Sequence, residues 1–124
     1  MQIADLAAIP GRRYPARRLT QNVVGGASPL QARAFAIGMV TLDPGGGQVP
    51  WHNQEQEEAY LVLEGEIEMC LGSERRLLTA GQAVCIPPKV FHQATNTGVT
   101  AARLLYCYGP AGEVAHWRQE LAGT

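Results

Sequence analysis

The sequence has no excess of charge of either sign, few aromatic residues and no long apolar run. Its 124 residues carry ten Lys and Arg against eleven Asp and Glu, a formal net charge of -1, and 6% aromatic residues. This balance excludes a globally basic nucleic-acid-binding protein and a polybasic membrane-binding protein. The apolar runs fall far short of the roughly 20 residues that a transmembrane helix needs. We therefore expect one compact domain over residues 1–124, with no nucleic-acid or membrane partner.

Cysteine is also scarce, and its spacing excludes a disulfide scaffold. Cys70, Cys85 and Cys107 form an odd number with no CxxC spacing, which is typical of reduced thiols. The first residues, MQIADLAAIPGRR, place Asp5 where a secretory signal would need its apolar stretch. Both observations predict a cytoplasmic protein.

Glycine and proline, by contrast, are frequent. Fourteen Gly and eight Pro divide the chain into short segments rich in Val, Ile, Leu, Tyr and Thr, a pattern typical of an all-β domain. No amphipathic segment of helix length interrupts the strands, so they must close into a sandwich or barrel to hide their edges. One short helix is expected over 113–121. The predicted strands are Arg33–Leu42, Ala59–Leu63, Glu66–Leu71, Arg76–Thr79, Ala83–Ile86, Phe91–Asn96 and Arg103–Tyr108.

Basic residues gather near the start of the chain. Four of the ten lie within residues 1–30, namely Arg12, Arg13, Arg17 and Arg18. We interpret residues 1–30 as an N-terminal arm, either solvated or a strand that packs on a partner subunit, and residues 33–108 as the barrel. A single aromatic residue, Tyr14, lies among the four arginines, which is not the repeated interleaving that nucleic-acid binding favours.

Two of the three histidines occupy special places. His52 follows a glycine-rich loop, and His92 follows the stiff Ile86–Pro88 segment. The residues that share the parity of His52, and so point to the same face wherever the chain is extended, are Gln54, Glu58 and Tyr60. Imidazole and carboxylate groups are costly to bury unless something satisfies them, and a divalent metal ion does so. The alternative is a pair of hydrogen-bonded core histidines without a metal. The third histidine, His116, falls on the expected helix and is not expected to be a ligand.

Two segments around these histidines have a regular spacing. In GGGQVPWHNQEQEEAYLVLEG the spaced residues are Gly46, His52, Gln54, Glu58 and Gly65, and in GQAVCIPPKVFHQATN they are Gly81, Pro87, Lys89, His92 and Asn96. These segments resemble the first and second motifs of the cupin family and span residues 46–96. The resemblance implies a double-stranded β-helix, or jelly roll, with one metal ion inside the barrel. It also implies a homodimer, which is common among small single-domain cupins.

The sequence departs from the family pattern at two positions. Gln54 stands where a second histidine is usual, and Lys89 where a glycine is usual. The resemblance implies His52, Glu58 and His92 as metal ligands, with Gln54 as a conditional fourth. A glutamine ligates through its carbonyl oxygen, which favours iron(II), manganese(II) or nickel(II), with zinc possible as well. Without Gln54, the set becomes two histidines and one carboxylate with open positions.

Other residues are candidates for the pocket wall around the ion, although each is also compatible with a core or solvated role. They are Met39, Tyr60, Ile86, Arg103, Tyr106 and Tyr108.

Three functions are compatible with this sequence. The first is a metal-dependent enzyme, of dioxygenase, isomerase, epimerase or cyclase type, acting on a small oxygen-rich substrate bound to the ion. The second is a non-enzymatic sensor or carrier of a metal or small ligand. The third is a structural cupin with a vestigial site, which the two departures at Gln54 and Lys89 keep open.

Overall fold

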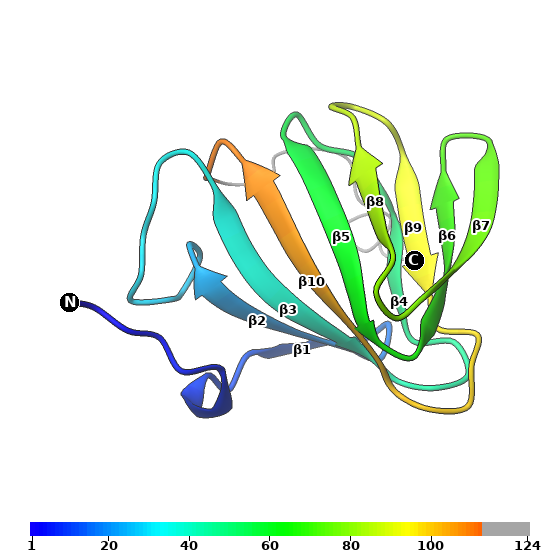
Figure 1. Cartoon of the computed structure of the whole chain (residues 1–124), viewed down its shortest axis with the longest axis horizontal. Coiled ribbons are helices and arrows are strands. Elements are labelled where there is room, and N and C mark those ends of the chain that lie inside the picture. The colour runs from blue at the N-terminus through cyan, green and yellow to red at the C-terminus, as the bar shows by residue number, and fades with distance from the viewer. Residues whose placement is uncertain (113–124) are drawn as a thin grey trace.

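The computed structural model describes residues 1–112, and these are nearly all β (Figure 1). The helix expected over 113–121 lies outside the described residues. Before the strands comes one short 3-10 turn, η1 (Leu6–Ala8). The strands of the described part are β1 (Arg12–Tyr14), β2 (Arg18–Val24), β3 (Ala36–Leu42), β4 (Gln48–His52), β5 (Glu57–Glu64), β6 (Glu66–Leu71), β7 (Glu74–Thr79), β8 (Ala83–Ile86), β9 (His92–Thr95) and β10 (Ala102–Gly109).

The strands form two antiparallel sheets. The six-stranded sheet has the order β1-β2-β3-β10-β5-β8, and the four-stranded sheet has the order β4-β9-β6-β7. Figure 1 shows the larger sheet running from blue β2 through cyan β3, orange β10 and green β5, with the smaller sheet beside it. The all-β prediction is confirmed.

A common core lies between the two sheets. Val62 on β5, Leu104 on β10 and Ile67 on β6 have no exposed surface and belong to one hydrophobic cluster. Burying each such side chain stabilises the fold by about 1.5–3 kcal/mol. Because side chains alternate along a strand, the inward position of Val62 also turns Tyr60 and Glu58 into the interior. Packing of Val62 in the core therefore directs the Glu58 carboxylate into the interior.

Several strands lie close to their predicted ranges, and three were missed. The segment predicted at Ala59–Leu63, for example, is the strand Glu57–Glu64. The missed strands are β1, β2 and β4. Strand β4 contains Pro50 and forms an edge of its sheet, where a residue without an N–H group is tolerated. Proline made this segment look like a loop.

Residues 12–24 are not a separate arm. They form β1 and β2, and β2 pairs with β3 from Arg18 opposite Leu42 to Val24 opposite Ile37. The expectation of a solvated arm is therefore wrong for Arg18, whose residue is only 3% exposed. Its strand was missed because the face of β2 that carries Arg18 is polar, which hides the strand from hydrophobic periodicity.

Two glycines are required by close packing. Gly65 connects β5 to β6 at a φ of 74°, and a Cβ atom there would lie 2.8 Å from the carbonyl oxygen of Ala101. A Cβ atom on Gly38 would overlap the ring of Tyr106. Glycine at position 65 thus makes the turn at the end of the first motif, and glycine at position 38 makes room for a buried tyrosine.

Neither a disulfide nor a membrane-spanning helix occurs in the described part of the chain. Cys70, Cys85 and Cys107 are free thiols, and Cys85 is exposed. No helix within residues 1–112 has the length and apolar character needed to cross a bilayer.

Candidate metal centre

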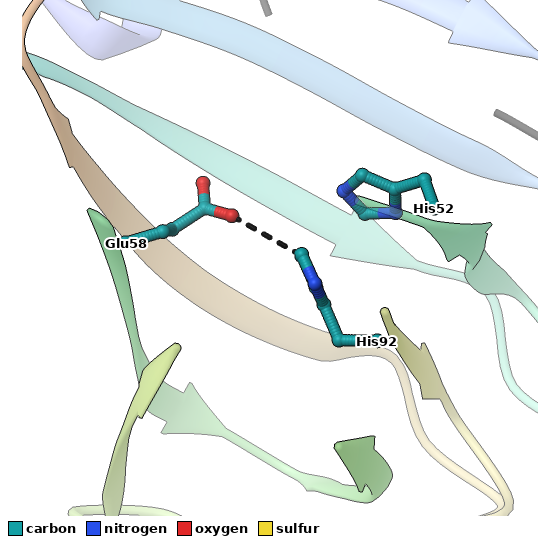
Figure 2. A group of neighbouring side chains, drawn as sticks. All are labelled: His52, Glu58 and His92. Atoms are coloured by element: carbon teal, nitrogen blue, oxygen red, sulfur yellow. Dashed lines mark ion pairs between the residues drawn. The ribbon is translucent and has the colours of Figure 1, made fainter. Parts of the chain in front are cut away.

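His52, His92 and Glu58 meet between the two sheets. His52 ends β4 and His92 begins β9, and the two residues face each other in that ladder. Glu58 comes from β5 of the larger sheet. One ligand atom from each side chain lies within 4.8 Å of the other two, and the residues are 3%, 0% and 7% exposed. Figure 2 shows the Glu58 carboxylate pointing toward the His92 ring, with the His52 ring nearby.

The backbone fixes the orientation of both imidazole rings. Nδ1 of His52 lies 2.8 Å from the carbonyl oxygen of Pro50, and Nδ1 of His92 lies 2.9 Å from that of Val90. A carbonyl oxygen only accepts hydrogen bonds, so each Nδ1 carries a proton and donates it. In a neutral ring, Nε2 then keeps its lone pair. This is the arrangement in which histidines bind metal ions.

Several polar atoms at this centre are buried and have no hydrogen-bond partner among the described residues. They are Nε2 of His92, Oε1 of Glu58 and Nε2 of Gln54. The first two lie 3.4 Å apart. Leaving a buried polar atom unsatisfied costs about 1–3 kcal/mol, and a divalent ion would satisfy the nitrogen and the oxygen together. The residues present therefore fit a metal ion.

Gln54 is placed where it can act as a fourth metal ligand. Its side chain lies at the same cavity as His52 and Glu58, and its residue is 2% exposed. Rotating the amide by a half turn exchanges its nitrogen and oxygen. Such a rotation would place the amide oxygen, which can bind a metal ion, at the buried position where the amide nitrogen has no partner in the described part of the chain.

A cavity of about 160 Å³ adjoins the centre. His52, Gln54 and Glu58 line it, together with the predicted pocket residues Tyr60, Tyr106 and Tyr108. The apolar part of its wall includes Val40 and Val49. The structure thus joins the candidate ligands to a space for a small molecule.

Met39, Ile86 and Arg103, also predicted for the pocket, do not line the cavity. Met39 lies on the opposite face of β3 from Val40, because neighbouring side chains alternate. Ile86 has no exposed surface and belongs to the core cluster. Arg103 makes an ion pair with Glu64 at 3.5 Å instead.

Tyr106 is a neutral hydrogen-bonding group in the cavity wall. Its hydroxyl donates to Oδ1 of Asn22 at 2.7 Å. Burial, followed by the neighbouring Tyr108 and Glu58, raises the pKa of Tyr106 well above its ordinary value. The hydroxyl therefore stays protonated at neutral pH.

One side of the cavity was missed by sequence reasoning. It is built from β1 and β2 by Tyr14, Arg18, Thr20 and Asn22. The Arg18 guanidinium carbon lies 4.0 Å from the centre of the Tyr14 ring. The alternation of Arg18, Thr20 and Asn22 along the chain could have indicated a strand. Because these residues are polar, they give no hydrophobic periodicity.

Lys89 adopts a glycine-like backbone. Its φ is 69°, in the left-handed region where glycine is usual. The Lys89 N–H donates to the Gln54 carbonyl at 2.6 Å, and Nδ2 of Asn53 donates to the Lys89 carbonyl at 3.0 Å. These bonds join the loops of the two motifs, so this departure preserves the local geometry.

Comparison with known proteins assigns the family. The family described as Cupin domain (Cupin_2) matches residues 38–108, and the chain belongs to the cupin family. An uncharacterized protein of Methanocaldococcus jannaschii is 37% identical over 54 residues, which are 44% of this chain and 43% of that protein. The chain thus aligns with less than half the length of this relative.

Solved structures share the fold. An RmlC-like cupin from Shewanella frigidimarina is 20% identical with a TM-score of 0.76, covering 91% of this chain and 94% of that one. An oxalate oxidase is 19% identical with a TM-score of 0.78, over 95% of this chain and 63% of the oxidase. The polyketide cyclase RemF from Streptomyces resistomycificus is 20% identical with a TM-score of 0.73, over 88% and 79%. These likenesses confirm the jelly-roll barrel.

Proposed function

We propose that this cupin is a metal-dependent enzyme that acts on a small oxygen-rich molecule bound at the ion. Nε2 of His52, Nε2 of His92 and a Glu58 carboxylate oxygen would hold one divalent transition metal, with Gln54 as a fourth, oxygen donor. The supporting observation is the convergence of three donor atoms within 4.8 Å beside a cavity of about 160 Å³. Both histidines have Nδ1 committed to backbone carbonyls.

The donor set favours iron(II), manganese(II) or nickel(II), with zinc as a further candidate, because it mixes imidazole nitrogen with carboxylate and amide oxygen. A bound ion of this kind polarises the oxygen atoms coordinated to it. Glu58 contributes one negative charge and so offsets part of the charge of the ion.

The remaining cavity residues orient the bound molecule. The Tyr106 hydroxyl donates to Asn22, and its oxygen can still accept a hydrogen bond from the bound molecule. Val40 and Val49 supply apolar surface that limits water. Because structures of this fold include an oxalate oxidase and a polyketide cyclase, the cavity residues, rather than the barrel, set the reaction type. Dioxygenase, isomerase or epimerase, and cyclase chemistry are the proposed types.

Elemental analysis of protein purified without chelator tests the metal site. We expect about one metal ion per chain, lost in His52→Ala, His92→Ala and Glu58→Gln. Glu57→Gln is the matched control for the carboxylate, since Glu57 is the exposed neighbour of Glu58. His116→Ala is the control for histidine removal. A wild-type chain that holds no metal, even after ions are added back, would contradict the proposal and favour a vestigial site.

Turnover separates the enzyme from a carrier or sensor. The metal-loaded protein is screened for oxygen consumption and for conversion of hydroxy and oxo acids, sugars and enolisable ketones. Metal-dependent turnover that Glu58→Gln abolishes is the expected result. Metal binding without any turnover would contradict the enzyme proposal and favour a non-enzymatic metal-binding module.

The homodimer and the cytoplasmic location remain predictions. Light scattering of the purified protein tests the first. Localisation of the tagged chain in its cell tests the second, which the three free thiols favour.

A further inference from the structure

Arg18 brings a positive charge to the wall of the cavity beside the candidate metal centre. It begins β2, and its side chain shares one strand face with Thr20 and Asn22, which also line the cavity. A guanidinium stays charged at any pH that proteins tolerate, and arginine is seldom buried to 3% exposure. A permanent cation therefore borders the same space as His52 and Glu58.

The Arg18 guanidinium packs against the ring of Tyr14. The guanidinium carbon lies 4.0 Å from the centre of the Tyr14 ring, which also lines the cavity. This is a cation–π contact, and the N–H donors of a guanidinium lie in the plane of the group. Donors in such a planar fork match the two oxygens of a carboxylate.

The charges around the cavity favour an anion. Among the described residues that line it, Arg18 and Glu58 are the charged ones, and they balance each other. A divalent ion at the candidate metal centre would leave two positive charges in excess. A negatively charged ligand offsets part of this excess, whereas a neutral sugar or ketone does not.

The volume of the cavity indicates the size of the molecule that fits inside it. Its volume is about 160 Å³, and a cavity of about 150 Å³ is known to hold one benzene molecule. A ligand with roughly six non-hydrogen atoms therefore fits.

From these observations we infer that Arg18 binds the carboxylate of a small organic acid of about this size, and that such acids are the substrate class of the site. The inference rests on the proposed function, because it places the other end of the acid at the metal centre. Arg18 then determines specificity by selecting the anion and orienting it toward His52 and Glu58.

Calorimetric titration with L-lactate and L-lactamide tests this inference. The two probes have the same number of non-hydrogen atoms and differ in charge. They are titrated into wild type and Arg18→Met, with the metal content of each protein measured first. Wild type is expected to bind lactate more tightly than lactamide, and Arg18→Met to weaken lactate binding by about tenfold or more, the usual loss for a charged hydrogen bond. Lactamide binding should stay unchanged.

Arg12→Met is the matched control. Arg12 also packs on the Tyr14 ring, with its guanidinium carbon 4.8 Å from the ring centre, but it is exposed and does not line the cavity. Its loss should leave lactate affinity unchanged. If Arg18→Met does not fold, as judged by its circular dichroism melting curve, Arg18→Lys replaces it. The lysine keeps the charge but loses the planar fork, and lactate should then bind several-fold more weakly.

The outcomes separate the two proposals. An Arg18 variant that keeps wild-type lactate affinity, or metal-loaded wild type that binds no lactate at millimolar concentrations, would overturn the role of Arg18 and leave the metal centre intact. Wild type that holds no metal but binds lactate through Arg18 would overturn the metal-dependent function, and with it the substrate class, but would keep Arg18 as a carboxylate-binding residue.

Discussion

Replacing Glu58 by glutamine should stabilise the metal-free protein while removing its response to metal. Oε1 of Glu58 and Nε2 of His92 lie 3.4 Å apart, and within residues 1–112 neither of these buried atoms has a hydrogen-bond partner. Because Nδ1 of His92 donates to the Val90 carbonyl, its Nε2 is an acceptor in the neutral ring. Without a metal, two acceptors therefore face each other.

Glu58→Gln keeps the shape of the side chain and replaces one oxygen by an N–H donor. The donor can bond to Nε2 of His92, which satisfies a buried atom and removes a buried charge. Satisfying one such atom is worth about 1–3 kcal/mol. For a domain of this size, each kcal/mol corresponds to roughly 3–6 °C in Tm.

Differential scanning fluorimetry measures both effects at mildly alkaline pH. In EDTA, Glu58→Gln should melt above wild type. With manganese(II) added at about 100 times its dissociation constant, wild type should gain about 2.7 kcal/mol and the variant almost nothing. Glu57→Gln, at the exposed neighbouring position, should behave as wild type.

A Glu58→Gln variant that melts below wild type in EDTA would refute this reasoning. That result would mean that a protonated His92 forms a stabilising ion pair with Glu58, and that the two acceptors do not face each other. A variant that keeps the full response to manganese would instead refute the assignment of Glu58 as a ligand.

Other predictions concern Tyr106 and three backbone positions. Folding raises the pKa of Tyr106, so its protonated form stabilises the protein below the unfolded pKa of about 10, and this stability is lost as the pH rises above that value. In urea titrations above this pH, Tyr106→Phe should therefore lose less stability than wild type. Equal losses would contradict the linkage. Gly65→Ala should cost about 2 kcal/mol or more, because it combines a φ of 74° with a collision against a backbone carbonyl. Gly45→Ala, at a φ of 69° with open space around it, should cost less, and equal costs would show that the collision does not matter. Lys89→Gly relieves a left-handed backbone, which costs about 1–2 kcal/mol. It also loses the exposed ion pair between Lys89 and Glu55, worth about 0–1 kcal/mol. Its free energy of unfolding should rise by up to about 1 kcal/mol, and a marked fall would contradict this account.

Local pattern was enough to predict the all-β fold, and the resemblance to the two cupin motifs implied the convergence of the candidate ligands. Alternation along β5 places Glu58 and Tyr60 on the same inward face as Val62, and a period of two is readable from the sequence itself. The spacing of the two motifs identified His52 and His92, which the structure brings opposite each other. The ranges of β1, β2 and β4 were not readable, because proline in β4 and polar residues in β2 mask the apolar alternation.

The sequence by itself predicted short antiparallel strands that close into a sandwich or barrel, and its resemblance to the cupin motifs implied that two histidines and a glutamate meet inside. Only the tertiary structure decided which other side chains join them. Arg18 reaches the cavity because β2 pairs with β3, and Tyr106 meets Asn22 across 84 residues of sequence. Met39 and Arg103 lie outside the cavity, because strand pairing also decides which face of β3 and β10 borders it. Alternation is a property of neighbours along one strand, whereas the wall of a cavity is a property of strand pairing between distant segments.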